Sequence, residues 1–579
     1  MQGRRWLTAG AATAVLLVAA TATASTSVTS RGQGAESVEA PFAQAWAHVP
    51  RTPAARKKKS VLVFGIRNDI VGFNTALACC NALEAGFMGA TESGRGAFVQ
   101  NNRGVWVKDI VTQAAATRTT LSYTIRPNAY WYWGGKKLPV TYKDFVYTLR
   151  KMDDPSSLIA TRVGYANLDP TRYTHKGLKQ VTFFWKTKKC TLDFPCGAFA
   201  NWQSIFTGLF PSAALAGENF NTIWTDCICG NDGKPVSNGP FYLSNYTRGQ
   251  GSTLKVNPFF YGKTPGLAEV DMKVFTNTDA EVQALRGDEI DAAAPPFGSN
   301  LLPLKSTPGI TFTAIPGYYF EHIEFRMAKG SSNVLLRAPW MREAIALGID
   351  RQGIINTLYG DLAGTTKPMN NAIYYSTESA YKPDFARWNY NPAKALAILG
   401  KHCTGGGPNT VWQCSGLPAR FRWTWTAGIA TRTTIAEIAK AELKSIGIEL
   451  IEDPLPVDIL FGPAGLSSGD YDIAEFANIT SGDPGDWYDS WRCNGPQNVT
   501  GYCSTKVSKL MRAANTELDP AKRAADFQAA DKLMAASVPV LPLYQRPIPL
   551  IYRSNILGMV ANPGSFGPVW NIEDWKWRS

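Results

Sequence analysis

A strand–helix–strand pattern between residues 420 and 452 constrains the fold of this chain most strongly. Residues 421–425, FRWTW, alternate large aromatic and polar side chains as a β-strand does. Apolar residues then recur at helical spacing over 435–446, and a second alternating run occupies 448–452. Two strands joined through a helix form a right-handed parallel unit. The pattern therefore predicts an α/β fold that contains a parallel sheet.

The length of the chain argues for more than one domain. Its 579 residues are too many for a single hydrophobic core. The hydrophobic share of 45% and the charged share of 18% are ordinary for a soluble globular protein. Eight basic and two acidic residues in the segment 1–59 account for +6 of the net charge of +13. The remaining charge is spread over a long body, so we expect no nucleic-acid partner.

The N-terminus has the pattern of an export signal. Arg4 and Arg5 form a positive region, residues 7–20 an apolar region, and residues 22–24, Ala-Thr-Ala, a cleavage site. The apolar run is too short to span a bilayer. We therefore predict a signal peptide over residues 1–24, exported by the general route, with twin-arginine export as the alternative.

The segment 25–59 is predicted to be a linker between the signal peptide and the folded part of the chain. It is rich in Ser, Thr, Ala and Pro and ends in a basic run, which is typical of a disordered linker. The first cysteine of the chain is Cys79, so none stands at the cleavage site to carry a lipid. We expect an exported protein, periplasmic or extracellular, that is not lipid-anchored through a signal-site cysteine.

The ten cysteines fit an oxidising compartment. Their spacing includes no two Cys-x-x-Cys pairs, so we expect no zinc or other metal site. Three local disulfide bonds are expected between cysteines that flank short loops: Cys190–Cys196, Cys403–Cys414 and Cys493–Cys503.

The other four cysteines form two close sets. Cys79 is adjacent to Cys80, and Cys227 is two residues from Cys229. Disulfide geometry is demanding, and a bond within either set requires an unusual backbone. We therefore expect the disulfides to join one set to the other.

Residues 238–262, NGPFYLSNYTRGQGSTLKVNPFFYG, predict a β-hairpin. Two β-prone runs, 241–243 and 254–256, flank a flexible turn rich in glycine. The order Gly-Pro-Phe-Tyr-Leu, turn, Leu-x-Val-Asn-Pro-x-x-Tyr-Gly resembles the central hairpin of family-5 solute-binding proteins. Members of that family are the extracytoplasmic receptors of peptide-type ATP-binding-cassette importers.

Further motifs of this family follow in the right order, so that the resemblance extends over residues 60–579. In one, Thr141 and Asp144 form an approximate capping box at the start of a predicted helix. Each motif is weak alone, and their shared order makes the resemblance specific. The matching segments are 61–74, 119–150, 279–291, 338–355, 391–396 and 538–544.

The resemblance implies a two-lobed type II periplasmic-binding-protein fold with an extra subdomain inserted in the first lobe. It also implies that a ligand lies between lobes that close about a hinge. The expected parts are lobe 1 over 60–95 and 225–325, the inserted subdomain over 96–224, lobe 2 over 326–543, and a C-terminal return to lobe 1 over 544–579.

Candidate ligand-binding residues follow from the position of sites in open α/β sheets, outside the carboxyl ends of the strands. That rule selects the loops 68–74, 426–433 and 477–491 and the strand that crosses between the lobes. For each aromatic candidate, packing in the core is the alternative role. The predicted ligand-binding residues are Asn68, Asp69, Phe73, Tyr319, Trp425, Asn478, Thr480, Asp483 and Trp487.

One of these positions departs from the family pattern. Peptide-binding members hold the peptide ammonium with an aspartate shortly before Gly-Asp-Pro. This chain keeps Gly482-Asp483-Pro484, but Thr480 occupies the upstream position. Because burial of an unpaired ammonium is costly, the change argues against a peptide with a free amino group unless Asp483 or Asp486 replaces the missing carboxylate. Glycans, opine-like compounds and other polar solutes remain open.

The function implied by the resemblance is capture of a peptide or other polar solute and its delivery to the membrane subunits of a permease. We expect a monomer that uses no cofactor and catalyses no reaction. One alternative is a secreted hydrolase that uses the loop carboxylates Asp483 and Asp486; another is a sensor without transport. The Gly-x-Ser-x-Gly run at 465–469 does not favour a hydrolase, because no histidine follows His402.

Overall fold

The computed structural model describes residues 60–80, 82–188, 196–275, 277–331, 333–360, 366–461 and 464–579. The predicted signal peptide and linker, residues 1–59, lie outside this part of the chain. Cys190 also lies outside it, and with it the predicted Cys190–Cys196 bond.

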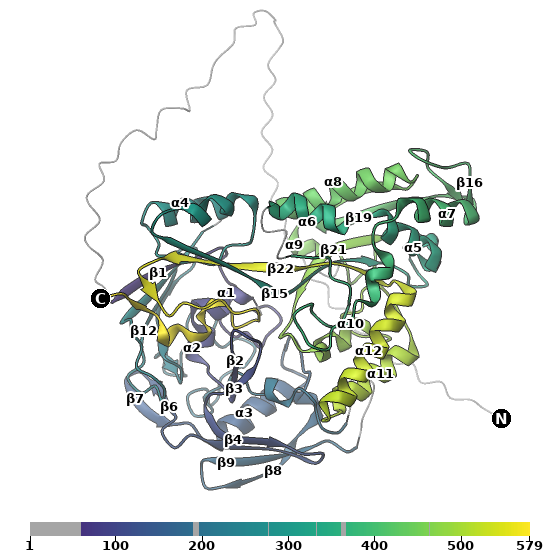
Figure 1. Ribbon diagram of the computed structural model, residues 1–579. Helices are drawn as coiled ribbons and strands as arrows, with labels where there is room; N and C mark the ends of the chain where they lie inside the picture. Colours follow the sequence, from purple (N-terminus) through teal and green to yellow (C-terminus); the bar gives the residue numbers. More distant parts are fainter. Residues whose placement is uncertain are drawn as a thin grey trace, which may run out of the picture. The chain divides into compact units, whose positions relative to one another are not determined.

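A ten-stranded mixed sheet runs through the described part of the chain (Figure 1). The two longest strands, β15 and β22, are neighbours near its middle and pair antiparallel. The order of the strands is β11 (Phe241–Thr247), β12 (Gly251–Val256), β13 (Glu269–Val274), β1 (Val61–Ile66), β14 (Ala292–Ala293), β22 (Val540–Arg553), β15 (Ile310–Phe325), β21 (Ile473–Ile479), β19 (Arg420–Thr426) and β20 (Glu449–Leu455).

Each side of the β15–β22 pair contains parallel strands. On one side β1 is parallel to β13 and β14, and on the other β19 is parallel to β20 and β21. Helix α8 (Ala430–Ser445) connects β19 to β20. The parallel unit expected from residues 420–452 is therefore confirmed, and the α/β class with it.

The predicted hairpin is also present. Strands β11 and β12 pair antiparallel, with Phe241 opposite Val256, and β12 continues into an antiparallel pair with β13. Inward-facing Leu243 and Leu254 are buried beside each other. The hairpin therefore builds one edge of the large sheet, far along the sheet from β21.

Three large groups of buried apolar side chains divide the molecule into two lobes and a subdomain. One group surrounds β1 and β13, a second fills the region 97–236, and the third combines buried residues of 282–304 and strand β15 with the helices and strands that follow it. Apolar burial is the main driving force of folding, so separate cores define separately packed bodies. The exact boundaries in the chain remain a prediction.

The inserted subdomain is built on a four-stranded antiparallel sheet and helix α3 (Tyr142–Asp153). The predicted capping box opens α3: Thr141 N–H donates to Asp144 Oδ2 at 2.8 Å, and the Thr141 side chain accepts from Lys143 N–H. The strands of this sheet are β4 (Val111–Ala116), β5 (Thr120–Ile125), β9 (Gln180–Trp185) and β8 (Leu168–Lys176). A two-stranded sheet adds β2 (Phe98–Gln100) and β3 (Trp106–Lys108), and a three-stranded sheet adds β10 (Val236–Ser237), β6 (Tyr130–Trp133) and β7 (Lys136–Pro139).

The second lobe carries most of the long helices. Asp350 caps one of them, as its sequence predicts, by accepting hydrogen bonds from Gln352 and Gly353 N–H. None of the helices in the described residues is long and apolar enough to cross a membrane. The α-helices of this lobe are α5 (Pro339–Gly348), α6 (Arg351–Tyr359), α7 (Pro392–His402), α8, α9 (Val457–Leu460), α10 (Tyr488–Trp491), α11 (Thr505–Thr516) and α12 (Pro520–Ser537).

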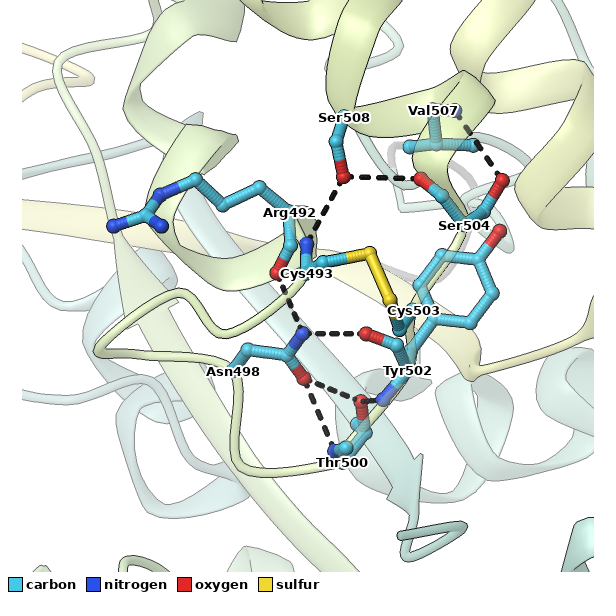
Figure 2. The surroundings of a disulfide bond; sticks show 10 residues. Arg492, Cys493, Asn498, Thr500, Tyr502, Cys503, Ser504, Val507 and Ser508 are labelled. Carbon is cyan, nitrogen blue, oxygen red and sulfur yellow. Dashed lines mark hydrogen bonds between the residues drawn. A yellow bond between two sulfur atoms is a disulfide. The ribbon is translucent and has the colours of Figure 1, made fainter. Parts of the chain in front are cut away.

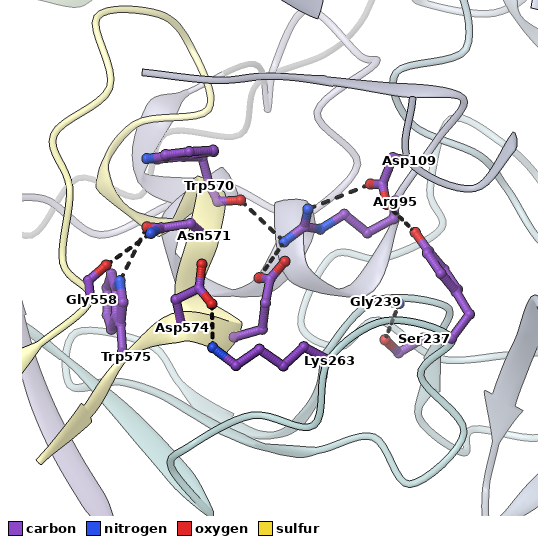
Figure 3. Close-up of polar contacts among 12 residues, drawn as sticks. Arg95, Asp109, Ser237, Gly239, Lys263, Gly558, Trp570, Asn571, Asp574 and Trp575 are labelled. Atoms are coloured by element: carbon purple, nitrogen blue, oxygen red, sulfur yellow. Dashed lines mark hydrogen bonds and ion pairs between the residues drawn. The ribbon is translucent and has the colours of Figure 1, made fainter. Parts of the chain in front are cut away.

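The C-terminal segment packs against the first lobe (Figure 3). Arg95 is buried and forms ion pairs with Asp109 at 3.4 Å and Glu573 at 3.1 Å. The same guanidinium donates to the carbonyl of Trp570. Trp575, which follows η9 (Pro568–Asp574), is fully buried in the core around β1. These contacts hold the end of the chain to residues more than 450 positions earlier.

The disulfides follow the sequence prediction in part. Cys403 is joined to Cys414 and Cys493 to Cys503, as predicted. The expected cross-pairing of the two close sets is wrong, because the structure joins Cys79 to Cys80 and Cys227 to Cys229.

The two close sets nevertheless lie near each other. A Cβ placed on Gly72 would lie 3.3 Å from Cys80 Sγ and 3.4 Å from Thr225 Cα. The segments that carry the two sets therefore approach each other at Gly72.

Candidate functional site

A cleft of about 1200 Å³ lies among the two lobes and the subdomain. It opens at the carboxyl ends of β1 and β21, where ligands of open α/β sheets bind. Its walls come from segments far apart in the sequence. They are residues 64–67, parts of 82–94 and 204–208, 294–297, Tyr319, 478–481, 486–490, 496–499, 546–549 and 565–566.

Four of the nine predicted ligand-binding residues line this cleft: Tyr319, Asn478, Thr480 and Trp487. Tyr319 lies on β15 opposite Ile479 of β21, at the point where the crossing strand passes the cleft. The other three lie on the end of β21 and the loop after it. Trp487 is only 2% exposed, so little of its surface reaches the cleft. Its ring packs against Phe320 and Trp491.

Two predicted aromatics lie in cores instead. Phe73 is fully buried and meets the ring of Tyr246 edge-on at 5.1 Å. Trp425 is 2% exposed and belongs to the core of the second lobe. Neither side chain lines the cleft. Both pack in a core, which was the alternative to ligand binding for the aromatic candidates.

Asn68 and Asp69 form hydrogen bonds within the first lobe. Asn68 donates to Glu84 Oε1 at 3.1 Å. Asp69 accepts from the hydroxyl of Tyr246 at 2.7 Å and from Gly249 N–H, so it fastens the turn of the β11–β12 hairpin. Neither residue lines the cleft. The sequence placed them correctly on a loop after β1, but that loop turns toward the hairpin.

Asp483 is committed to an internal ion pair. Arg523 donates Nη1 to its Oδ2 at 2.9 Å and Nη2 to its Oδ1 at 2.6 Å. Asp483 Oδ1 also accepts from Gly485 N–H at 2.7 Å and so caps η8 (Pro484–Trp487). Its charge is therefore neutralised within the protein, outside the lining of the cleft.

Thr480 takes part in a local hydrogen-bond network. Its Oγ1 lies 2.9 Å from the hydroxyl of Tyr375 and accepts from Gly482 N–H at 3.0 Å. The side chain is neutral, and the residue is only 8% exposed. At the position where the sequence pattern predicts the family's ammonium-binding aspartate, this chain has a neutral hydroxyl group.

Asp486 was named from sequence only as a catalytic alternative, yet it lines the cleft. Its Oδ2 accepts from Ser481 N–H at 2.7 Å and from Ser481 Oγ at 2.8 Å. Burial, with the nearby charge of Asp483, raises the pKa of Asp486 to about 7. Near neutral pH Asp486 is therefore only partly ionised, and its carboxyl oxygen already accepts two hydrogen bonds from Ser481.

Arg546 is a cleft residue that sequence reasoning missed. It lies on β22, with its Nε 3.5 Å from Glu321 Oε2 and its guanidinium carbon 5.6 Å from the centre of the Tyr319 ring. Burial alone lowers its pKa, but the charge of Glu321 raises the pKa above the ordinary arginine value. The signal in the sequence was a lone arginine within a buried apolar run.

Glu321 also meets a second arginine behind the cleft wall. Arg432 Nε lies 3.4 Å from Glu321 and 3.8 Å from Glu475, and its Nη1 donates to Thr426 Oγ1 at 2.7 Å. Burial, followed by the charge of Glu321, raises the pKa of Glu475 well above the usual range. Burial would raise the pKa of Glu321 as well, but the two arginines lower it overall.

Contacts also cross from the subdomain to the second lobe. Gln100 on β2 donates its Nε2 to the carbonyl of Ser481 at 2.7 Å. Ala200 N–H donates to the carbonyl of Asn515 on α11 at 2.8 Å. The first of these bonds joins the loop that carries Thr480 and Asp486 to the subdomain.

A disulfide-bonded loop forms another part of the wall (Figure 2). Cys493 and Cys503 close it, and residues 496, 497 and 499 line the cleft. Asn498 holds the loop from inside: its Nδ2 donates to the carbonyls of Arg492 and Tyr502 at 2.8 and 2.7 Å. Its Oδ1 accepts from Thr500 Oγ1 at 2.8 Å.

The cleft does not carry the groups that a serine hydrolase uses. Ser467, from the Gly-x-Ser-x-Gly run, lies in the wall, but no histidine is among the described lining residues. His322 is fully buried, with Nε2 3.1 Å from Glu324 and Nδ1 2.9 Å from the carbonyl of Phe320. In the described ranges, no group of three or more His, Cys, Asp or Glu side chains is arranged to hold a metal ion.

Residues 111–499 match the family described as "Bacterial extracellular solute-binding proteins, family 5 Middle". The chain belongs to this family. The resemblance drawn from the hairpin and the ordered motifs is thereby confirmed. The chain is a solute-binding protein of the kind that serves ATP-binding-cassette importers, and it is not an enzyme.

Related proteins of known name agree with this assignment. The oligopeptide-binding protein OppA of Mycobacterium tuberculosis (strain H37Rv) is 27% identical over 471 residues, 79% of this chain and 74% of that protein. OppA of Bacillus subtilis is 25% identical over 467 residues, 77% of this chain and 80% of that protein. The probable periplasmic-binding protein SapA of Escherichia coli is 26% identical over 337 residues, 57% of this chain and 58% of that protein.

Solved structures show the same fold. The periplasmic EDTA-binding protein EppA superimposes with a TM-score of 0.79 at 20% identity, over 90% of this chain and 96% of that one. The oligopeptide-binding protein AppA of B. subtilis, in complex with a nonapeptide, gives 0.73 at 18% identity, over 90% and 99%. The two-lobed architecture with an inserted subdomain is therefore that of the family-5 periplasmic binding proteins.

Proposed function

We propose that this solute-binding protein captures a polar solute other than a free-amino peptide in the 1200 Å³ cleft and delivers it to the permease subunits of an importer. The observation that carries the proposal is the loop after β21. Its neutral Thr480 stands where peptide-binding members carry an aspartate, and Asp483 is neutralised by Arg523.

The electrostatics of the loop support this choice of solute. Burial of an ammonium group requires a fixed negative charge beside it. Asp486 is the remaining cleft carboxyl of this loop, and its pKa near 7 leaves it only partly charged at neutral pH. No such charge is needed to bind peptides with a blocked amino group, glycans or opine-like compounds. Several relatives are named as peptide-binding proteins, so free-amino peptides are included among the solutes to be tested.

The proposed capture uses closure of the two lobes around the solute. The strands β15 and β22 both pass from one lobe to the other and form the natural hinge. The hydrogen bond between Gln100 and Ser481 is one contact that closure would make. A ligand shifts such an equilibrium only through contacts that differ between the open and closed states.

The family also suggests the location, the oligomeric state and the partner of the protein. We propose that it is exported, acts as a monomer and is not anchored by a lipid at a signal-site cysteine. Its partner is then the permease, and its contact with the membrane is indirect. Import of the identified solute, measured in cells with and without the gene, separates a transport role from a sensor role.

Mass spectrometry of ligand retained through purification tests the proposal directly. Thermal-shift titration is the second measurement, because a solute at about 100 times its dissociation constant stabilises the protein by about 2.7 kcal/mol. We expect N-acetylated peptides or non-peptide polar solutes to raise the melting temperature more than free-amino peptides do. A stronger shift with free-amino peptides would overturn the proposed solute class, and turnover of any bound compound would favour the hydrolase alternative.

A further inference from the structure

The guanidinium of Arg546 has hydrogen-bond donors without acceptors among the described residues. Its contact with Glu321 is an ion pair through Nε at 3.5 Å, beyond the usual range of a hydrogen bond. Within the described residues its other nitrogens donate no hydrogen bond, and the side chain lines the cleft with 22% of its surface exposed. An arginine carries five N–H donors in a flat fork. Those of Arg546 are therefore available to a molecule in the cleft.

The charges around Arg546 do not cancel. Arg432 and Arg546 both contact Glu321, the carboxylate between them. Glu475 is fully buried, and neither of its oxygens accepts a hydrogen bond from a donor in the described residues. A carboxyl in such a place keeps its proton. Two guanidinium groups then face one carboxylate, and the group carries a net positive charge at the cleft wall.

Aromatic and apolar side chains lie beside Arg546 in the cleft. Its guanidinium carbon lies over the Tyr319 ring, 5.6 Å from the ring centre. A planar fork presented edge-on binds a carboxylate or phosphate through two parallel hydrogen bonds. Pro547 and Ile548, which follow Arg546 on β22, also line the cleft and add apolar contact beside that edge.

We infer that Arg546 binds an anionic group of the solute, a carboxylate or a phosphate, through the free edge of its guanidinium. The inference rests on the proposed capture of a solute in this cleft and narrows it to anionic solutes. Glu321 acts as a positioning residue that orients the guanidinium from behind. Arg432 keeps Glu321 ionised, which leaves Arg546 free to turn its donors to the cleft.

Pairs of compounds that differ only in the anionic group test this inference. We choose N-acetyl-trialanine and its C-terminal amide, glucuronate and glucuronamide, and glucose 6-phosphate and glucose, with thermal shift as the screen and calorimetry for the affinities. The first two pairs probe a carboxylate, and the third probes a phosphate. We expect at least one acid to bind tenfold or more tightly than its neutral partner.

Three variants then assign the effect. Arg546→Gln is expected to lose at least tenfold in affinity for that acid and little for the neutral partner, and Arg546→Lys is expected to recover only part of the loss. Arg286→Gln is the matched control, since Arg286 is an exposed arginine at the end of the helix Thr278–Arg286, outside the cleft lining. Its affinity is expected to stay within threefold of the wild type. Each shift is referred to the ligand-free melting temperature of the same variant, so that a loss of stability is not mistaken for a loss of binding.

The outcomes separate the two proposals. If acids and neutral partners bind equally, or if Arg286→Gln loses as much as Arg546→Gln, the assignment to Arg546 is overturned while solute capture stands. If no compound of the panel binds, acidic or neutral, the proposed capture of such polar solutes fails and the inference fails with it.

Discussion

Arg523 and Asp483 form a two-point ion pair behind the loop that carries Thr480, with N–O distances of 2.9 and 2.6 Å. Both side chains are mostly buried. Removal of one partner leaves the other charge buried and unpaired, which costs more than the pair contributes. We expect Arg523→Gln to lower the free energy of unfolding by about 3 kcal/mol.

A double-mutant cycle with Asp483→Asn checks this expectation by denaturant unfolding. The double variant is expected to recover part of the loss, because neither charge is then left alone. Lys440→Gln is the control, since its ion pair with Glu452 is exposed and should contribute less than about 1 kcal/mol. Equal costs for Arg523→Gln and Lys440→Gln would contradict the buried-pair argument.

Thr480→Asp is expected to create affinity for free-amino peptides. The new carboxylate can keep the hydrogen bond from Gly482 N–H and adds a negative charge at this position of the cleft wall. A charge-assisted hydrogen bond contributes about 1.5–3 kcal/mol, so the affinity for trialanine should rise roughly tenfold or more. Calorimetry of trialanine against N-acetyl-trialanine measures the change.

Thr480→Asn provides the matched control for this experiment. It has the shape of aspartate without the charge, so trialanine should bind it no better than it binds the wild type. A similar gain in Thr480→Asn and Thr480→Asp would show that the shape of the side chain, and not its charge, is responsible.

The acidic group beneath the loop should make stability depend on pH. Burial, with the charges of Asp483 and Asp486, raises the pKa of Glu378 to about 8, although Tyr375 N–H donates to its carboxylate at 2.6 Å. In the unfolded chain a glutamate titrates near about 4.3. Between these values the folded protein holds one more proton, so this contribution to stability is lost as pH rises.

Glu378→Gln tests the sign of that dependence. The wild type should lose up to about 1.4 kcal/mol per pH unit through this residue between pH 4.5 and 8, and the variant should lose correspondingly less. Melting temperatures at pH 5, 6, 7 and 8 give the slopes. Glu437→Gln, on the exposed face of α8, should keep the wild-type slope. Parallel slopes for Glu378→Gln and the wild type would refute the prediction.

The sequence was informative wherever the signal is local. The β11–β12 hairpin, the capping box of Thr141 and Asp144 and the unit around α8 depend on neighbours within about 30 residues, and all three are present. Alternation failed for Trp425 because β19 is buried along most of its length, so the pattern does not tell which side chains reach a ligand.

The residues missed in the cleft have a different cause. Arg546 gains its role from contacts with Glu321, more than 220 residues earlier, and Asp486 gains its raised pKa from burial that no local pattern reports. Asp69 shows the reverse error: its loop follows β1 as predicted, yet it binds the hairpin turn. Which way a loop turns is decided by tertiary contacts that spacing in the sequence does not encode.

The two disulfides of the second lobe should differ in their effect on binding. Cys493–Cys503 and Cys403–Cys414 are 10 and 11 residues apart in sequence, so loop-closure entropy predicts similar stabilisation from each, about 2–4 kcal/mol. Only the first closes a loop that lines the cleft, around Asn498.

We expect the double variant Cys493→Ala/Cys503→Ala to bind its solute at least threefold more weakly. Cys403→Ala/Cys414→Ala should lose stability alone, because β16 (Cys403–Thr404) and β17 (Gln413–Cys414) lie outside the cleft lining. Calorimetry with any compound found to bind, together with unfolding curves, separates the two effects. Equal affinities in the two double variants would show that the hydrogen bonds of Asn498 hold the loop without the disulfide.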